Sequence, residues 1–254
     1  MTISVVLITH NEEDNLARTL DSVMPLVRDG RGEIILVDSG STDRTLEIAC
    51  EYGARIFVEP WKGFAAQKNS AMDKALMDWV LQLDADEALE PALAEEIEDA
   101  IQNDSKNNGF WIPRKNSFLG RWIKHGGFYP DPKLRLIRRG SGRFEEYGAH
   151  PTIKIEGPIG RLSHAMLHHA YPTLHAYIDH MNSYSSMGAE VVAAKRAAGF
   201  SVSNIVIRPA CTFLYNYIFR LGFLDGREGL LLHLYHAVYV SWKYAKAWEI
   251  SHRK

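Results

Sequence analysis

Four short apolar runs open the chain, and each is followed by a polar loop. The runs are residues 3–8 (ISVVLI), 33–37 (EIILV), 54–59 (ARIFVE) and 79–84 (WVLQLD). Continuous aliphatic and β-branched residues are typical of strands buried on both faces of a parallel sheet. Between the runs, apolar residues recur at helical spacing, as at Leu16, Leu20 and Val23. The alternation predicts a β-α-β-α-β-α-β series, and hence an α/β fold with a mainly parallel central sheet flanked by helices.

Polar residues between these elements predict where the helices begin and end. Asn11 is expected to cap the first helix, with acidic side chains next to it at the positive helix end. Ser41 or Thr42 is expected to cap the second helix, and Gly53 to end it.

After Pro91 the pattern changes. Residues 92–102 (ALAEEIEDAIQ) predict a surface helix, and residues 109–139 predict irregular antiparallel strands and loops. From about Leu174 the pattern is helical again, which predicts a helical C-terminal extension.

The composition is that of an ordinary soluble globular protein, with 254 residues, 46% hydrophobic and 24% charged. A formal net charge of −2 argues against a nucleic-acid partner. The N-terminus has no basic region before its apolar run, so it predicts a first strand rather than a signal peptide. Cys50 and Cys211 lie in apolar sequence and are expected to be packed thiols, which fits a reducing, cytoplasmic compartment.

One segment is strongly basic despite the balanced total charge. Residues 132–143 (PKLRLIRRGSGR) carry five cationic side chains. Two interpretations stay open, a solvated basic face and a pocket for phosphate groups.

Acidic residues gather in three loops that follow predicted strands. The loops begin with THNEE after residue 8, DSGSTD after residue 37 and DADE after residue 83. Each alone is explained equally well as a capped turn. In open parallel sheets, however, ligands bind at the edge where the carboxyl ends of strands meet. Crowded carboxylates there need a cation, and magnesium or manganese completed by a diphosphate would supply it. Neither a dinucleotide-binding nor a phosphate-loop glycine motif follows the first strand.

The first 90 residues contain four motifs in order: SVVLITHNEEDNLARTLDSV, EIILVDSGSTDRTLEIA, GFAAQKNSAM and WVLQLDADE. They resemble the nucleotide-sugar signatures of family 2 glycosyltransferases, which have the GT-A fold. The later segments RLIRR, HHAYPTLHAYIDHMNSYSS and FLDGREGLLLHLYHAVYVSWKYAKAWE resemble a narrower group, the bacterial glucosyltransferase-like proteins of lipopolysaccharide core assembly. The resemblance implies a GT-A domain over 1–172, divided into a nucleotide-sugar half (1–90) and an acceptor half (91–172), and a helical extension over 173–254.

The resemblance also implies how the donor is held. Thr9, Asn11 and Glu12 would line the nucleoside pocket, with Glu12 near the ribose. Asp38 would hydrogen-bond the base, expected to be uracil, and Ser39 belongs to the same loop. Positions that would approach the donor from later elements are Lys68, Asn69 and Arg135.

Metal and base positions follow from the same resemblance. Asp84 and Asp86 match the DxD pair, in which the first acid contacts ribose or sugar and the second binds the metal. Related proteins have a His-Glu pair in the acceptor half, and here His150 precedes Pro151 instead. His150 is expected to be the base or a metal ligand, with Glu145 and Glu146 as alternative bases. Of the remaining histidines, expected to be packing or surface residues, His168 is the best exception. Arg135, Arg138 or Arg139 would neutralise the leaving group or hold acceptor phosphates.

These residues point first to an inverting, metal-dependent glycosyltransferase. It would move glucose or another hexose from a UDP-sugar to a cell-envelope glycan or glycolipid, such as the lipopolysaccharide core. The missing Glu after His150 leaves a non-catalytic nucleotide-sugar-binding module open. A sugar-phosphate nucleotidyltransferase would need a Gly-rich, Arg-containing loop after the first strand, and THNEEDN is not one.

The C-terminal segment predicts contact with a membrane surface. Its apolar stretch, residues 229–242, is shorter than the roughly 20 residues of a bilayer span. Aromatic and basic residues within and after this stretch suit the interface of an anionic bilayer, at the inner face of the cytoplasmic membrane. They are Tyr235, Tyr239, Trp242, Lys243, Tyr244, Lys246, Trp248, Arg253 and Lys254. A helix packed on the domain, or a homodimer contact, is the open alternative.

Overall fold

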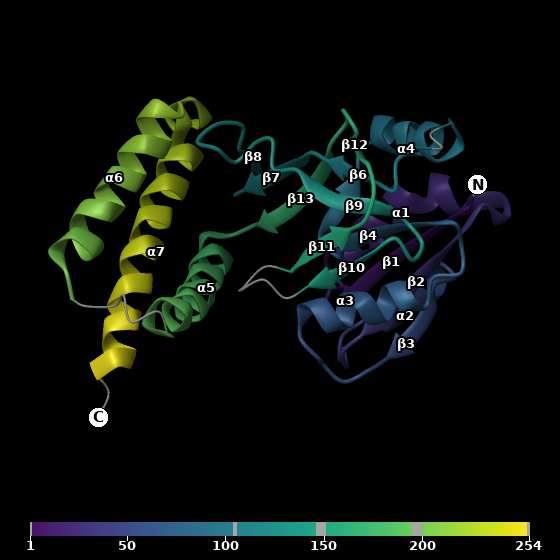
Figure 1. Ribbon diagram of the computed structural model, residues 1–254, viewed down its shortest axis with the longest axis horizontal. Coiled ribbons are helices and arrows are strands. Elements are labelled where there is room, and N and C mark those ends of the chain that lie inside the picture. Colours follow the sequence, from purple (N-terminus) through teal and green to yellow (C-terminus); the bar gives the residue numbers. More distant parts are fainter. Residues whose placement is uncertain (1, 104–105, 146–150, 195–199, 253–254) are drawn as a thin grey trace. The chain divides into compact units, whose positions relative to one another are not determined.

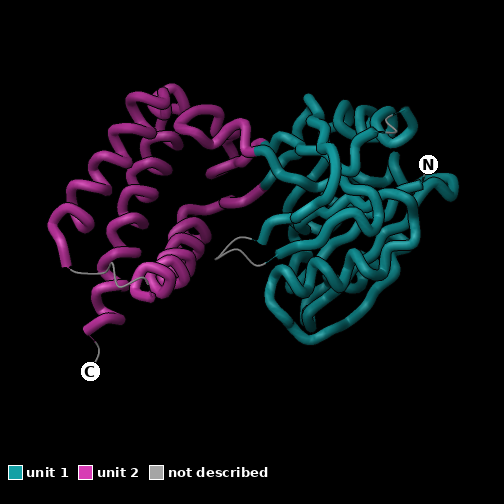
Figure 2. Tube along the Cα trace, in the orientation of Figure 1, with its two compact units in different colours: residues 1–114, 132–168 teal, residues 115–131, 169–254 magenta. Residues whose placement is uncertain are grey.

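The computed structural model describes residues 2–103, 106–145, 151–194 and 200–252. Figure 2 shows that the chain forms two compact units. Unit 1 comprises residues 1–114 and 132–168, and unit 2 comprises residues 115–131 and 169–254. The domain limits expected at residues 90 and 172 stay a prediction.

Unit 1 is built on a seven-stranded sheet, with its strands in the order β12-β6-β9-β4-β1-β2-β3 (Figure 1). β1 pairs in parallel with β2 and β4, β2 pairs in parallel with β3, and β9 runs antiparallel to β4 and β6. The sheet strands are β1 (Ile3–Thr9), β2 (Gly32–Asp38), β3 (Arg55–Val58), β4 (Trp79–Asp84), β6 (Gly109–Ile112), β9 (Lys133–Arg138) and β12 (Ile159–Arg161). All four apolar runs are strands of this sheet, and the mainly parallel α/β fold is confirmed.

The helices of unit 1 cover both faces of the sheet because strand side chains alternate between the faces. Val5 and Leu7 of β1 belong to a buried cluster that includes Leu20 of α1, whereas Val6 packs in a second cluster with Ala71 of α3. The helices are α1 (Leu16–Val27), η1 (Arg28–Gly30), α2 (Thr45–Glu51), α3 (Phe64–Asp73) and α4 (Pro91–Asn103). A hairpin of β10 (Gly142–Glu145) and β11 (Thr152–Ile155) joins the second cluster through Phe144 and Ile153.

The predicted helix caps were wrong at both positions. α1 begins at Leu16 and α2 at Thr45, each several residues after the expected cap. Asn11 instead accepts a hydrogen bond from the Thr42 N–H through Oδ1 (2.9 Å), and its own N–H donates to Ser41 Oγ (2.9 Å). These polar residues tie the loop after β1 to the loop after β2, so they are not available to cap helices. Gly53, with φ of 69°, follows the end of α2 as predicted.

Unit 2 is mainly helical. Its helices are α5 (Leu174–Ala194), η2 (Ser203–Ile207), α6 (Arg208–Leu214), η3 (Tyr215–Phe219), η4 (Gly222–Asp225) and α7 (Gly226–His252). The remaining strands are β5 (Glu87–Leu89) in unit 1, β8 (Arg121–Trp122) in unit 2, and β7 (Arg114–Phe118) and β13 (Met166–Tyr171), through which the chain passes between units. Among the described residues, no helix is both long and apolar enough to cross a bilayer.

Much of the expected membrane-facing surface of α7 lies inside unit 2. Tyr235, Tyr239 and Trp242 pack against a core of Phe118, Ile123, Tyr177, Met181 and Leu232. Lys246 Nζ donates to Asn182 Oδ1 (2.6 Å) of α5. α7 is therefore a helix packed on its own unit, one of the alternatives that the sequence left open. Arg253 and Lys254 lie outside the described residues.

The two cysteines are free thiols but are not packed, which corrects the expectation of buried side chains. Cys50 of α2 and Cys211 of α6 are both exposed. Beside Cys50, the apolar residues Ile48 and Ala49 are buried while Cys50 faces outward, which is a consequence of helical periodicity. Around Cys211, the apolar residues Ile207 and Leu214 are themselves exposed.

Replacing Leu81 by Ala tests the core of unit 1. Leu81 is fully buried in the centre of β4, so Leu81→Ala is expected to lower the free energy of unfolding by about 2–5 kcal/mol. The matched control is Leu76→Ala, because the Leu76 side chain is 62% exposed. Thermal or urea denaturation should show a change of less than about 0.5 kcal/mol for the control. Equal losses in both variants would contradict this placement of the core.

Candidate active site

The loop after β2 is organised by the Asp38 carboxylate. Asp38 is fully buried, and Oδ1 accepts hydrogen bonds from Thr9 Oγ1 (2.8 Å) and Ser41 Oγ (2.5 Å). Its Oδ2 accepts from the N–H groups of Gly40 (2.8 Å) and Ser41 (2.7 Å). Burial alone would raise the pKa of Asp38, but these donors bring it below its ordinary value. The contact between Asp38 and the uracil nucleobase stays a prediction. A nucleobase would have to compete with the four hydrogen-bond donors that the Asp38 carboxylate already has.

Neighbouring residues hold the first loop against the second. Ser39 donates through both its N–H and its hydroxyl to the Thr9 carbonyl, at 3.0 Å each. The Glu12 N–H donates to Thr45 Oγ1 (2.8 Å). Burial raises the pKa of Glu12, and the charges of Asp86 and Asp84 raise it further. The acidic side chains of the loops after β1 and β4 are therefore close enough to repel one another, as the parallel sheet predicts.

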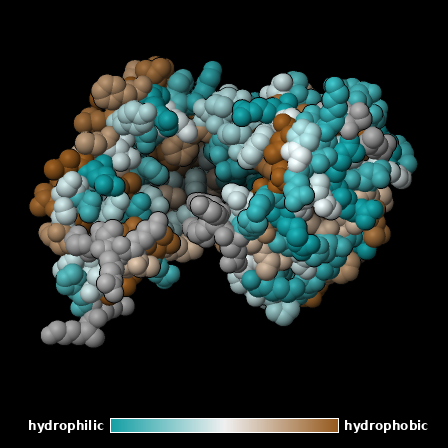
Figure 3. All heavy atoms as spheres, in the orientation of Figure 1, coloured by the Kyte–Doolittle hydropathy of each residue, from teal (hydrophilic) through white to brown (hydrophobic). Residues whose placement is uncertain are grey.

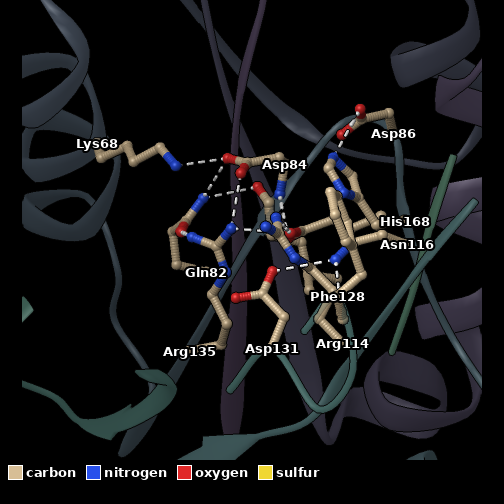
Figure 4. A network of polar contacts seen from close by, with 12 residues as sticks. Lys68, Gln82, Asp84, Asp86, Arg114, Asn116, Phe128, Asp131, Arg135 and His168 are labelled. Atoms are coloured by element: carbon tan, nitrogen blue, oxygen red, sulfur yellow. Dashed lines mark hydrogen bonds and ion pairs between the residues drawn. The ribbon is translucent and has the colours of Figure 1, made fainter. Parts of the chain in front are cut away.

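Asp84, the last residue of β4, lies between two cationic side chains (Figure 4). Lys68 Nζ donates to its Oδ1 (2.5 Å), and Arg135 Nη2 donates to its Oδ2 (2.6 Å). Both cations are almost fully buried. Burial alone would raise the pKa of Asp84, but the charges of Arg135 and Lys68 hold it well below its usual range. Asp84 is therefore a carboxylate whose two oxygens are both neutralised within the protein.

Glu87 fixes the far side of this arrangement. It is fully buried, and its Oε1 accepts from Arg114 Nη1 and Arg135 Nη2, each at 2.9 Å. Its Oε2 accepts from the Asp84 N–H (3.0 Å), and Arg135 Nη1 also donates to Gln82 Oε1. These contacts hold the turn that carries Asp86. Glu87 is the last acid of the DADE motif, but no local sequence pattern marks Gln82 or Arg114 as its neighbours.

Asp86 faces a histidine (Figure 4). His168 Nε2 lies 3.2 Å from Asp86 Oδ2, and the register of β13 against β5 pairs His168 with Glu87, next to Asp86. Burial raises the pKa of Asp86, but the hydrogen bond and charge of His168 bring it below its ordinary value. Both side chains are partly exposed. A carboxylate oxygen and an imidazole nitrogen, both suited to metal ligation, thus lie side by side at the carboxyl end of β4. His168 is the histidine that the sequence singled out from those expected to be packing or surface residues.

Asn69 connects the site to the β10–β11 hairpin. Its Nδ2 donates to the Phe144 carbonyl (2.9 Å), and its Oδ1 accepts from the Phe144 N–H (2.8 Å). Glu145 follows at the exposed end of β10, near Lys154. Glu146 and His150 lie outside the described residues, so the predicted base stays a prediction.

The basic run does not form one phosphate pocket. Arg135 is buried against Asp84, at the carboxyl end of β4. Arg138 pairs with Trp79 at the opposite end of the same strand, and Arg139 Nε donates to the Met77 carbonyl (2.9 Å). β9 runs antiparallel to β4, so the earlier residue Arg135 lies toward the carboxyl end of β4 and the later residue Arg138 lies at its amino end. The expectation that Arg138 or Arg139 serves the leaving group was wrong.

Residues 4–156, more than half of the chain, match the model of glycosyl transferase family 2. The chain belongs to glycosyl transferase family 2. It is 30% identical to lipopolysaccharide core biosynthesis glycosyltransferase LpsC of Rhizobium meliloti, over 97% of this chain and 92% of the relative. It is 44% identical to an uncharacterized glycosyltransferase of Rickettsia conorii, over 90% of this chain and 83% of the relative. The family resemblance of the four motifs is confirmed, and the protein is a glycosyltransferase.

Two solved structures show the same fold at low sequence identity. One is mannosyltransferase PcManGT from Pyrobaculum calidifontis in complex with GDP-Man and Mn²⁺, with a TM-score of 0.56 and 15% identity over 96% of this chain and 86% of that one. The other is S. aureus TarS 1–349 in complex with UDP-GlcNAc, with a TM-score of 0.52 and 16% identity over 97% and 90%. They confirm the GT-A fold of this family 2 member.

Replacing Arg135 by Met tests the buried ion pairs. Arg135→Met leaves Glu87 and Asp84 with one cation fewer, and breaking a buried pair costs about 3–5 kcal/mol. The control is Arg139→Met, because that side chain is exposed and expected to change the free energy of unfolding by less than about 0.5 kcal/mol.

The free energy of unfolding should depend on pH in the way that the lowered pKa of Asp84 requires. A carboxylate whose pKa is lowered in the folded state stabilises the fold at pH values above its pKa in the unfolded state, which is near 3.9. That stabilisation is lost as the pH falls toward the folded-state pKa. The difference between wild type and Arg135→Met should therefore shrink below about pH 4 in urea denaturation. A difference that is constant from neutral pH to pH 3 would contradict the ion-pair account.

Proposed function

We propose that this family 2 glycosyltransferase transfers a hexose, such as glucose, from a UDP-sugar to a glycan or glycolipid of the bacterial cell envelope. The observation that carries the proposal is the contrast between two acids on one turn. Asp84 is neutralised by Lys68 and Arg135, while Asp86 faces His168. The name of the LpsC relative supports a lipopolysaccharide-core acceptor. The resemblance of the first four motifs to nucleotide-sugar signatures implies a UDP-linked donor.

The residues present fit a divalent cation. Carboxylate oxygens suit magnesium and manganese, and an imidazole nitrogen beside the carboxylate favours manganese. Asp86 and His168 would hold the cation, which when bound neutralises the charge that grows on the leaving diphosphate. The described residues contain no group of three or more His, Cys, Asp or Glu side chains suited to a metal. We therefore propose that the donor diphosphate completes the ligand set.

The protein side chains divide the remaining work. Asp84, held rigidly by its two cations, would accept hydrogen bonds from the ribose or the sugar hydroxyls. In an inverting single displacement, the acceptor oxygen bonds to the anomeric carbon as the bond to the diphosphate breaks. The acceptor proton passes to a general base on the opposite face. Glu145, Glu146 and His150 are the proposed candidates for that base, and UDP is the leaving group.

A donor-hydrolysis panel tests the proposed function. UDP-, GDP- and dTDP-linked sugars would each be incubated with the protein and manganese or magnesium, and released nucleotide would be measured. We expect release from a UDP-hexose with manganese, and little release after chelation of the metal. Binding of a UDP-sugar by calorimetry without turnover, with or without a lipopolysaccharide-core acceptor, would favour the non-catalytic module instead.

Asp86→Asn tests the metal ligand. An amide keeps the size of the side chain but lacks the carboxylate charge that oxygen ligation of manganese requires. The variant should fold normally and bind uridine alone. It should lose the strengthening of UDP affinity by manganese, and turnover should fall by several orders of magnitude because leaving-group neutralisation contributes several kcal/mol. Calorimetric titration of UDP with and without manganese measures the effect, and an unchanged metal effect would contradict the assignment.

His168→Ala tests the second ligand in the same titration. We expect a weaker manganese effect on UDP affinity, with a smaller loss than in Asp86→Asn because the carboxylate remains. The matched control is His164→Ala, since His164 is an exposed histidine that contacts Glu96 rather than an acid of the site. An identical manganese effect in wild type and His168→Ala would remove His168 from the ligand set.

A further inference from the structure

Residues 203–219 of unit 2 form one continuous helical segment with two different faces. α6 is flanked by the π-helical turns η2 and η3. One face packs inward: Pro209 is buried, and Ser241 Oγ of α7 donates to the Ile205 carbonyl (2.9 Å). The helical segment is therefore anchored on α7 along one side.

The opposite face carries large exposed apolar side chains. Ile207, Leu214 and Ile218 recur at helical spacing with the exposed Cys211 between them, so they share one face. Phe219 is 76% exposed. The exposed apolar face, as we call it, comprises Phe200, Val202, Val206, Ile207, Leu214, Tyr215, Ile218, Phe219, Leu221, Phe223 and Leu224. Figure 3 shows brown spheres gathered over this part of unit 2, where Figure 1 labels α6. Contiguous apolar surface of this kind marks an interaction site in soluble domains.

Within residues 200–224 the charged residues are two arginines, Arg208 and Arg220. Between Glu190 and Asp225 the chain contains no Asp or Glu. Both arginines are exposed, Arg208 at the start of α6 and Arg220 directly after η3. Arg208 Nη1 donates to the Tyr244 hydroxyl (2.8 Å), and the Arg220 guanidinium lies over the Tyr215 ring, 5.1 Å from its centroid. These stacked and bonded cations lie next to apolar side chains, an arrangement that suits lipid headgroups above acyl chains.

We propose that the exposed apolar face docks on an anionic lipid bilayer, with Phe219 and its neighbours entering the acyl boundary and Arg208 and Arg220 meeting the headgroups. An amphipathic helix that lies in the bilayer surface needs one apolar face, one packed or polar face and flanking cations, and this segment has all three. The occupant follows from charge complementarity, because only a negatively charged surface gains from the arginines.

A second copy of the chain fits the same face less well. In a two-fold dimer each face would meet itself, so that arginines would approach arginines. The stretch between Glu190 and Asp225 offers no carboxylate to pair with them. A bilayer of phosphatidylglycerol supplies the missing negative charge.

This docking surface differs from the one that the sequence suggested. Tyr235, Tyr239 and Trp242 of α7 pack against the unit 2 core, whereas the exposed apolar face comes mainly from the preceding segment. The inference agrees with a lipid-linked acceptor but does not depend on the proposed function, since it is tested without donor or acceptor.

The two exposed cysteines allow a matched test. Cys50→Ser leaves Cys211 on the exposed apolar face as the only cysteine, and Cys211→Ser leaves Cys50 on α2 of unit 1. Each variant of the full chain would be labelled with an environment-sensitive fluorophore and mixed with phosphatidylethanolamine–phosphatidylglycerol vesicles. We expect a blue shift and protection from an aqueous quencher for the label at Cys211, and no change for the label at Cys50. No change at Cys211, or equal changes at both positions, would overturn the proposal.

Vesicle flotation with substituted proteins separates apolar from electrostatic contributions. The triple variant Ile207→Asn, Leu214→Asn, Phe219→Asn should no longer float. The control Val58→Asn, Phe64→Asn, Leu76→Asn replaces equally exposed side chains on unit 1 and should float like wild type. Arg208→Gln and Arg220→Gln should each weaken binding to anionic vesicles about fivefold.

Two results of the flotation series would count against a bilayer. Equal flotation of wild type and the triple Asn variant would overturn the proposal. So would a wild-type dimer, found by sedimentation without vesicles, that the triple variant dissociates, because the face would then belong to a second copy.

Discussion

The candidate site depends on one buried carboxylate, Glu87, and the cations that it holds. A fully buried carboxylate is costly unless paired, and breaking such a pair costs several kcal/mol. Arg135 and Arg114 both donate to Glu87, and Arg135 also donates to Asp84. Lys68 completes the pairing of Asp84 from α3. Charge balance within the protein thus neutralises the first acid of the turn, and the second acid, Asp86, faces His168.

This balance explains why acids accumulate where β4 ends. Three carboxylates within four residues would repel one another if none were compensated. Two of them, Asp84 and Glu87, share Arg135, so they are structural parts of the site. Asp86 is the acid whose position suits binding of an added cation, and such a cation would in turn bind the negatively charged diphosphate. The same division assigns different work to two residues that look equivalent in the sequence.

The fold could be predicted from the sequence because each apolar run covers most or all of the strand that it forms. Continuous burial of β1, β2 and β4 requires helices on both faces, and the parallel order then brings the acidic loops to one edge. The loop polar residues were harder, since a side chain such as Asn11 or Ser41 can cap a helix or bridge two loops with similar hydrogen bonds. Only the sheet brings Asn11 next to Thr42, and that contact decides between the alternatives.

Contacts between distant segments account for most of what the sequence could not predict. His168 reaches Asp86 because β13 pairs antiparallel with β5, and a register shifted by one residue would turn it to the other face. Arg135 and Arg138 look alike in the basic run, yet the direction of β9 sends them to opposite ends of β4. On α7, the apolar and aromatic pattern is nearly uniform, so periodicity could not tell the face packed in unit 2 from an exposed one.

The division between Asp84 and Asp86 is tested most directly by locating the metal. Crystals grown with UDP and manganese would be measured at a wavelength where manganese scatters anomalously. The account predicts an anomalous peak at bonding distance from the Asp86 carboxylate and His168 Nε2, with Asp84 still between Lys68 and Arg135. A manganese ion bound by Asp84, with Lys68 displaced, or an ordered UDP with no metal beside Asp86, would contradict it.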